Sequence, residues 1–469
     1  MNRKLLFLAR AAVYLLAFVV PPVLISVTGV KAGLADRYEG PPAAARVQAA
    51  EFPAPPGHDP DKPTAVVLLS NRGSEVTDAL GPYEVLSESG AFNVYAAAPK
   101  REAATLSGGL DVQPQLTFAE LDRRLEGEDP DVVVVPAMWD AGSPGHRPVA
   151  EWLKEHAEGT GTLMSVCDGA EVLADAGLLD GRRATANWAN ISRWEGRYPE
   201  VEWVRGLRYV EDGNVTTAAG VTSGVAATLH VVRGYVGGEA AADLAREIGY
   251  PDQRLGEEPR IEVDRLSLSD RALYVLGGAY GWGKPKIGVV LNEGTSEIEF
   301  ASAFDAYPGS AFTSKTTSLA REGPRSPVRS EHSLYFVPRH DLEDAPPLDR
   351  LLVPGRDAAS ETDPAVLSWA RENGLEPEFV HADAAAGFPF DATLQDLAEH
   401  ENAPVARFLA RLLEYPTGHL ELAGDGWPFA RLLRPIAVGL LGLAGVILLE
   451  RLVLAPATKR LRRSRGKGA

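Results

Sequence analysis

Cys167 is the only cysteine among 469 residues, and it ends an apolar run directly before Asp168 and Gly169. A thiol at a strand-to-helix turn lies at the helix N-terminus, where free backbone N–H groups and the helix dipole favour a thiolate. Gly169 allows a sharp turn and close approach of a substrate. The backbone N–H of Asp168 is placed to donate to a developing oxyanion. The pattern predicts a nucleophile, with a small buried hydrophobe as the alternative.

The runs around this thiol predict a parallel sheet. Apolar strand-like runs begin near residues 64, 93, 131 and 162, and helical runs follow them. Strands that alternate with helices indicate an α/β fold with helices on both faces of the sheet. An Asp-Gly pair at residues 212–213 predicts a hairpin. One α/β domain is therefore expected over residues 64–250.

A similar order restarts in the second half of the chain. Residues 285–309 mirror residues 64–90, and "LDRLLVPGRDAA" mirrors "PDVVVVPAMWDAG". Such a long repeat indicates domain duplication rather than a solenoid. The sequence predicts two tandem copies, the second a degenerate one over residues 285–418 that has no cysteine. Linkers are expected over residues 35–63 and 251–284.

Apolar runs at both ends predict two membrane spans, at residues 1–34 and 430–455. The stretch from Ala11 to Val30 carries no charge and is long enough to cross a bilayer. A cleavable signal peptide is the alternative for the first run, and a buried or interfacial helix for the second. The basic tail, residues 456–469, is typical of a cytoplasmic flank. Both termini are thus expected to be cytoplasmic, with the domains extracytoplasmic.

The overall composition excludes several function classes. The net charge of −17 argues against a nucleic-acid partner, which needs a basic face. The nine histidines show no metal-ligand spacing, so neither a metal nor another cofactor is expected. His230 lies in the middle of a helical run and is interpreted as a packed core histidine.

Three stretches carry a resemblance: "SVCDGAEVLADAGLLDGRRATANW", "DALGPYEVL" and "GVTSGVAATLHVV". They resemble the DJ-1/PfpI superfamily, within the class I glutamine amidotransferase-like group. The branch they are most similar to contains isonitrile hydratase and the amidase-like sensor domain of AraC-type regulators. The resemblance covers residues 65–250 and implies a flavodoxin-like parallel sheet sandwiched by helices. The second half resembles the same fold only weakly.

The resemblance also implies roles for individual residues. Cys167 matches the family's nucleophile, and Asp78 matches the acid that approaches this cysteine and shuttles a proton. The backbone of Asp168 and Ala137 is expected at the oxyanion. The pocket residues expected from the same motifs are Gly169, Asn187 and Gly81.

The chain departs from the family pattern at four places. Asp168 replaces a threonine, and its charge disfavours a neighbouring thiolate. Asn187 replaces the histidine of the family's "TTHW", so a cysteine–histidine pair of that kind is missing. Ala137–Met138 replace two glycines that usually help to form the oxyanion pocket. Residues 223–225 replace the "AGI" of the family's "GITAGID".

Three functions follow as hypotheses. The first is a cysteine-dependent hydratase or hydrolase of an isonitrile- or amide-like small molecule, with Cys167 as nucleophile and Asp78 as proton shuttle. The second is a non-catalytic small-molecule sensor or binding module at the membrane. The third is a redox-responsive thiol protein, although the chain has no resolving cysteine. A homodimer is a further expectation.

Overall fold

The computed structural model describes residues 3–42, 53–251, 259–309, 311–382 and 387–454. Its main sheet has seven strands in the order β10-β11-β7-β6-β1-β2-β5, all parallel except the antiparallel pair of β10 and β11. The strands are β1 (Thr64–Leu68), β2 (Asn93–Ala98), β5 (Leu116–Thr117), β6 (Val132–Val135), β7 (Thr162–Val166), β10 (Tyr209–Asp212) and β11 (Val215–Ala218). The predicted parallel sheet and the hairpin at residues 212–213 are confirmed.

Helices cover both faces of this sheet because its strands are apolar on both sides. Val67 and Val134 face one hydrophobic core, and Val66 and Val133 face the other. The first core receives α2 (Val76–Glu88), α7 (Ser223–Val236) and α8 (Gly238–Glu247). The second receives α3 (Phe118–Arg124), α4 (Arg147–His156), α5 (Gly169–Asp175) and α6 (Ile191–Arg197).

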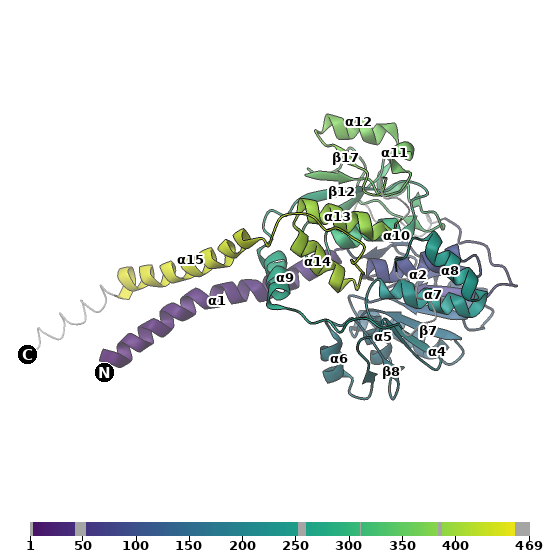
Figure 1. The fold of residues 1–469 in the computed structure, drawn as a ribbon, viewed down its shortest axis with the longest axis horizontal. Helices are drawn as coiled ribbons and strands as arrows, with labels where there is room; N and C mark the ends of the chain where they lie inside the picture. The colour runs from purple at the N-terminus through teal and green to yellow at the C-terminus, as the bar shows by residue number, and fades with distance from the viewer. Residues whose placement is uncertain (1–2, 43–52, 252–258, 310, 383–386, 455–469) are drawn as a thin grey trace, which may run out of the picture.

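The second half is built on a smaller parallel sheet in the order β13-β12-β16-β17. Its strands are β12 (Lys286–Val290), β13 (Lys315–Leu319), β16 (Arg350–Leu352) and β17 (Pro377–Glu378). Its helices are α10 (Glu297–Ala306), α11 (Ala358–Glu361), α12 (Pro364–Glu372), α13 (Pro389–His400) and α14 (Ala403–Leu412). This order matches β2-β1-β6-β7 of the first half, and Figure 1 shows the smaller sheet above the larger one.

The two halves share one hydrophobic core and are bonded to each other. Helices α2 and α10 pack against each other, and a carboxylate of each accepts a hydrogen bond from the first turn of the other. The N–H of Ile298, in the first turn of α10, donates to Glu84 Oε2 at 2.6 Å. Thr77 Oγ1, in the first turn of α2, donates to Asp305 Oδ2 at 3.0 Å. Each helix therefore places a carboxylate at the positive end of its neighbour.

Small sheets complete the structure. A four-stranded sheet that joins the halves comprises β3 (Ala104–Leu106), β4 (Leu110–Gln113), β14 (Val328–Arg329) and β15 (Tyr335–Phe336), with β4 and β15 antiparallel. The remaining short elements are β8 (Arg183–Ala184), β9 (Glu202–Trp203) and the 3-10 turns η3 (Pro144–His146) and η4 (Gly323–Arg325). The sheet of β4 and β15 makes the two halves one folded body.

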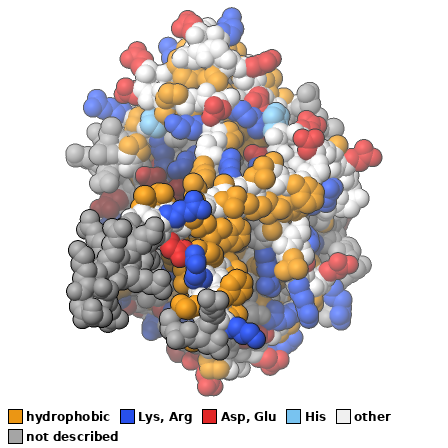
Figure 2. All heavy atoms as spheres, turned by 90° about the vertical axis from the view of Figure 1, so that its left-hand side faces the viewer, with side chains coloured by type: hydrophobic (Ala, Val, Ile, Leu, Met, Phe, Trp, Pro, Cys, Tyr) orange, Lys and Arg blue, Asp and Glu red, His pale blue; other side chains and the backbone are white. Residues whose placement is uncertain are grey.

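Two long apolar helices project side by side from this body (Figure 1). They are α1 (Arg3–Arg37) and α15 (Leu433–Leu449), which is preceded by η5 (Phe429–Leu432) and followed by the π-helical η6 (Glu450–Leu454). Residues 4–37 and 429–452 are long and apolar enough to cross a membrane. Seen from the side on which they project, hydrophobic side chains gather at the centre of the molecule (Figure 2).

Three polar side chains join these two helices. Arg10 Nη2 lies 2.8 Å from Glu450 Oε1, and the Tyr14 hydroxyl donates to Glu450 Oε2 at 2.5 Å. Gly442 packs against the backbone of Ala17, where a Cβ atom would lie 2.3 Å from the carbonyl oxygen. Paired charges and small residues at a helix contact are typical of membrane helices.

The predicted linker 251–284 is wrong over part of its length. Residues 268–280 form helix α9 (Leu268–Tyr280), which begins with a Ser267–Asp270 capping box. The helix packs on α1 so closely that a Cβ atom at Gly29 would lie 2.6 Å from Ala279 Cα. The Tyr280 hydroxyl also donates to the carbonyl of Pro22 at 2.7 Å. Residues 35–37, predicted as linker, are the last residues of α1.

Candidate functional site

Cys167 lies at the turn between β7 and α5, as the sequence predicts. Its φ of 56° places it in the left-handed region, and its N–H donates to the carbonyl of Ala218 at 3.1 Å. Gly169 is required at this turn because a Cβ atom there would lie 2.1 Å from the carbonyl oxygen of Val135. Gly169 therefore gives room to a neighbouring strand, and its expected role of admitting a substrate is not supported. The Cys167 side chain is buried.

Asp78 is fully buried in the first turn of α2 and faces Cys167. Its N–H donates to Glu75 Oε2 at 2.8 Å, and its Oδ2 accepts the N–H of Ala137 at 3.1 Å. Its Oδ1 has no hydrogen-bond partner among the described residues. The structure thus brings Cys167 and Asp78 together, but Asp78 occupies the Ala137 N–H that the sequence assigned to the oxyanion.

The environment raises the pKa of both groups. Burial raises the pKa of the Cys167 thiol well above its usual value, and the nearby carboxylates of Asp78 and Asp168 raise it further. Burial and the neighbouring Glu75 carboxylate also raise the pKa of Asp78 well above its usual value. The thiolate is therefore disfavoured, opposite to an activated nucleophile.

The side chain of Asp168 holds helix α6 and its N-cap residue against the turn that carries Cys167. Trp194 Nε1 donates to Oδ1 at 2.9 Å, and Asn190 Nδ2 donates to Oδ2 at 2.5 Å. Burial raises the pKa of Asp168, while these two donors lower it. The carboxylate ties α6 to the turn, and the backbone N–H of Asp168 bonds the Cys167 thiol and lowers its pKa. Both N–H groups predicted to bind an oxyanion, those of Ala137 and Asp168, are thus already engaged in hydrogen bonds.

The end of α1 covers one side of the site, which the sequence did not reveal. Arg37 Nη2 lies 3.4 Å from Asp305 Oδ1 and 3.9 Å from Glu75 Oε1. The Tyr38 ring stacks on Trp139 with 5.1 Å between centroids. Tyr38 is also near enough to Asp78 and Cys167 for their charges to raise its pKa. An arginine after an apolar span is common, so its sequence position gives no signal of this contact.

Asp305 brings the second half into the same cluster of buried carboxylates. Burial and the Glu75 carboxylate raise its pKa to about 8, against the lowering effect of Arg37. Four groups from three segments, Arg37, Glu75, Asp78 and Asp305, therefore share one buried electrostatic network beside Cys167.

The segment after α14 covers the other side. Asn187 Nδ2 donates to the carbonyl of Leu412 at 3.1 Å, and Thr222 Oγ1 donates to the carbonyl of Leu413 at 2.9 Å. Asn187, expected in an open pocket, is thus bound to the second half. Gly81, also expected in the pocket, lies at the α2–α7 contact, where a Cβ atom would be 3.3 Å from Val225.

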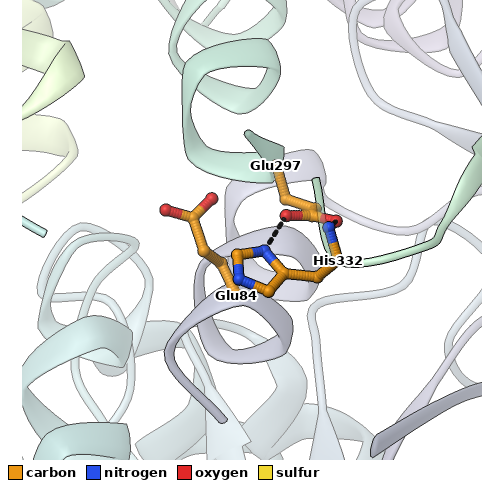
Figure 3. Close-up of side chains that lie close together, drawn as sticks. All are labelled: Glu84, Glu297 and His332. Carbon is orange, nitrogen blue, oxygen red and sulfur yellow. Dashed lines mark hydrogen bonds and ion pairs between the residues drawn. The ribbon is translucent and has the colours of Figure 1, made fainter. Parts of the chain in front are cut away.

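A second ionisable cluster joins the two halves away from Cys167. Figure 3 shows His332 between Glu84 and Glu297. His332 Nδ1 lies 2.8 Å from Glu297 Oε2, and Nε2 lies 2.6 Å from Glu88 Oε2. The two carboxylates raise the pKa of His332 to about 10, against the effect of burial. Both ring nitrogens are occupied, so the cluster acts as an ion-paired contact between the halves.

The interpretation of His230 as a core residue is wrong. Its ring stacks on Tyr209 at 4.7 Å, and Nε2 lies 2.8 Å from Glu211 Oε2. It lines a surface groove of 580 Å³ together with Arg233 and Tyr235. At this position α7 packs on β10, the edge strand of the sheet, so the His230 side chain stays partly exposed.

The sequence model of the DJ-1/PfpI family matches residues 64–233. Isonitrile hydratase of Pseudomonas putida is 30% identical over 181 residues, which are 37% of this chain and 72% of that protein. The chain belongs to the DJ-1/PfpI family. The resemblance seen in the sequence is thereby confirmed, and the described parallel sheet with helices on both faces has the expected flavodoxin-like α/β fold.

Two further similarities are to a transcriptional regulator and to a solved structure. The HTH-type transcriptional regulator CdhR of Pseudomonas aeruginosa is 30% identical over 145 residues, 31% of this chain and 39% of that regulator. A crystal structure of a ThiJ/PfpI family protein from Pseudomonas syringae aligns with a TM-score of 0.36 and 25% identity. It covers 43% of this chain and 85% of that protein.

Proposed function

We propose that this DJ-1/PfpI protein is a membrane-anchored, non-catalytic binding or sensor module for a small molecule. The observation that carries the proposal is the covering of the Cys167 site by the chain's own segments, Tyr38 directly after α1 and residues 411–413 at the end of α14. The Ala137 N–H is bonded to Asp78, so an oxyanion would have to displace a carboxylate before it bound there.

The protonation of the site supports the same proposal. A thiol attacks as its thiolate, and each unit by which the pKa exceeds the pH removes about tenfold of that form. Around Cys167, burial and two aspartates act together to raise the pKa. The histidine of the family's "TTHW" motif, a possible base for the thiol, is replaced by Asn187 in this chain.

A second candidate is the cysteine-dependent hydratase or hydrolase. Two observations favour it: the left-handed φ of Cys167 at the turn, and the unpartnered Oδ1 of Asp78 among the described residues. In this function the thiol would add to an isonitrile or amide carbon while Asp78 supplied the proton. The similarity to an isonitrile hydratase supports this chemistry.

One assay separates the two. The full chain in lipid nanodiscs is incubated with an alkyl isonitrile, and formation of the N-alkylformamide is followed beside the Cys167→Ser variant. The proposed module gives no product above that of the variant. Turnover that is lost in both Cys167→Ser and Asp78→Asn would establish the hydratase instead.

We further propose that α1 and α15 cross the membrane with both termini cytoplasmic. The Arg10–Glu450 pair supports this proposal, since it neutralises the charges that each apolar helix would bring into a bilayer. A Ser464→Cys variant in a Cys167→Ser background tests the orientation. An impermeant maleimide should label it only after cells are opened, and labelling of intact cells would refute the orientation.

We also propose that the second half is a degenerate copy of the first. The registers support this: Ile287 pairs with Arg350 as Ala65 pairs with Val132. Counting along β17 from this register puts His381 at the position of Cys167. His381 is buried, receives the N–H of Gly355 at 3.0 Å, and its pKa is lowered by burial to about 3. A neutral imidazole would thus replace the thiol.

A further inference from the structure

The carboxylate of Glu414 lies at the N-terminus of helix α7. Ser223 Oγ donates to Glu414 Oε2 at 2.6 Å. Gly220 is in close contact, because a Cβ atom there would lie 2.4 Å from Glu414 Cδ. Arg208 Nη1 donates to the Glu414 carbonyl at 3.1 Å and to Ser223 Oγ at 3.4 Å. We call Arg208, Gly220, Ser223 and the backbone of Trp188 the carboxylate nest.

The nest has the properties of an anion site. Helix α7 has 14 residues, and its N-cap residue Thr222 makes no side-chain capping bond, because its hydroxyl donates to Leu413. The N–H groups of Gly224 and Val225 donate to carbonyls of residues 220–222, so it is the positive end of the helix dipole that faces the nest. The buried Arg208 adds a positive charge. Burial raises the pKa of the Glu414 carboxyl to about 7, while Ser223, Arg208 and the nearby backbone N–H groups of Gly220 and Trp188 lower it.

Glu414 fills this nest imperfectly. Its φ is 54°, a left-handed backbone conformation that is unfavourable for a residue with a side chain. Its side chain is about nine-tenths buried, yet Oε1 has no hydrogen-bond partner in the described part of the chain. An occupant that leaves one carboxylate oxygen unsatisfied can be replaced by a ligand that satisfies both.

The position of the nest connects it with the Cys167 site. The Cys167 N–H donates to Ala218, only two residues before Gly220. Gly224, in the first turn of α7, packs against Val166, the residue before Cys167. The nest therefore lies at the carboxyl edge of the parallel sheet, where ligands of open α/β sheets bind.

We propose that the carboxylate nest is a binding site for a small carboxylate ligand, and that Glu414 is its built-in occupant, which the ligand displaces. This inference rests on the proposed binding function and names its ligand class. Displacement of Glu414 releases the bonds that residues 411–414 make to the first half, so the ligand uncovers that side of the Cys167 site.

Removal of the occupant tests the nest directly. Propionate has the size and charge of the deleted glutamate side chain, and propionamide is its neutral counterpart. Both are titrated calorimetrically into the full chain in nanodiscs, as wild type, Glu414→Ala and Glu414→Gln. The glutamine variant keeps the shape of the side chain, so it reports even where the alanine variant does not fold.

We expect propionate to bind each variant at least about tenfold more tightly than it binds wild type. We also expect each variant to bind propionate more tightly than it binds propionamide. Adding Ser223→Ala to the Glu414→Ala chain weakens propionate binding. Equal binding of propionate and propionamide would overturn the site, and equal affinity of wild type and variants would overturn Glu414 as its occupant. Isonitrile turnover by Cys167 would refute the proposed function without changing this result, so the two failures are distinguishable.

Discussion

The N–H of Ala137 donates to Asp78 Oδ2 at 3.1 Å. This bond joins the two groups that a cysteine enzyme of this family would use separately, an oxyanion donor and a proton shuttle. While it exists, the single backbone donor of Ala137 is occupied. The bond lowers the pKa of Asp78, but burial, the larger effect, raises it. The site is therefore arranged to be stable rather than reactive.

Neutralising Asp78 should make the Cys167 thiol more acidic. In Asp78→Asn the amide oxygen still accepts the Ala137 N–H, but the negative charge that raises the pKa of Cys167 is gone. The pKa should fall measurably in a titration of thiolate absorbance, which is unambiguous because the chain has one cysteine. Glu84→Gln changes a buried acid on the same helix that is not among the main groups acting on Cys167, and should leave the titration unchanged. An unaltered pKa in Asp78→Asn would contradict the account.

Arg37 should be essential for stability although it follows an apolar helix. Removing it leaves Glu75 and Asp305 without their buried cation, and a broken buried ion pair costs about 3 kcal/mol. The free energy of unfolding of Arg37→Gln in detergent should fall by that amount. Arg321 pairs with Asp363 on the surface, so Arg321→Gln should change the free energy by less than about 1 kcal/mol. Equal losses in the two variants would show that the buried network contributes nothing.

Stability should decrease as the pH rises toward 8. The pKa of Asp305 is about 8 in the folded chain, whereas an unfolded aspartate titrates near about 3.9. Between these values the folded state binds more protons than the unfolded state, so its stability falls with rising pH. The melting temperature of the full chain should drop from pH 5 to pH 8, and by less in Asp305→Asn. A variant with the same slope as wild type would exclude Asp305 as a source of the dependence.

The contact between Arg10 and Glu450 should behave as a charge pair inside an apolar environment. Arg10→Glu or Glu450→Arg alone places like charges together and should lower the melting temperature in nanodiscs. The double exchange, Arg10→Glu with Glu450→Arg, restores opposite charges and should recover most of the loss. Additive losses in the double variant would indicate that the two side chains do not pair in the membrane.

The sequence alone was sufficient for the parts of the fold that depend on local patterns. The apolar strands and the glycine after Cys167 predicted the sheet and the turn, because buried strands and tight turns have strong compositional signals. The approach of Asp78 to Cys167 came from the family motif, since nothing local links residues so far apart in the chain.

The remaining features depend on contacts between distant segments. Arg37, Asp305 and Glu414 reach the site from the first helix and the second half, and each is an ordinary charged residue in its own stretch. The β4–β15 pairing that joins the halves involves strands too short to show a period. The sequence predicts a linker at helix α9 because its apolar face is completed by residues distant in the chain, Ile25, Val30, Trp427 and Val438.

The central claim is that the chain itself closes the Cys167 site and keeps the thiol protonated, and alkylation of this single cysteine tests it most directly. The rate of iodoacetamide modification at pH 7.4 is measured for the native full chain in nanodiscs and for the same chain unfolded in guanidinium chloride. The account predicts that the native chain reacts at least about 100-fold more slowly, because access and thiolate fraction are both reduced. A native rate equal to or above the unfolded rate would contradict it and would indicate an open, activated thiol.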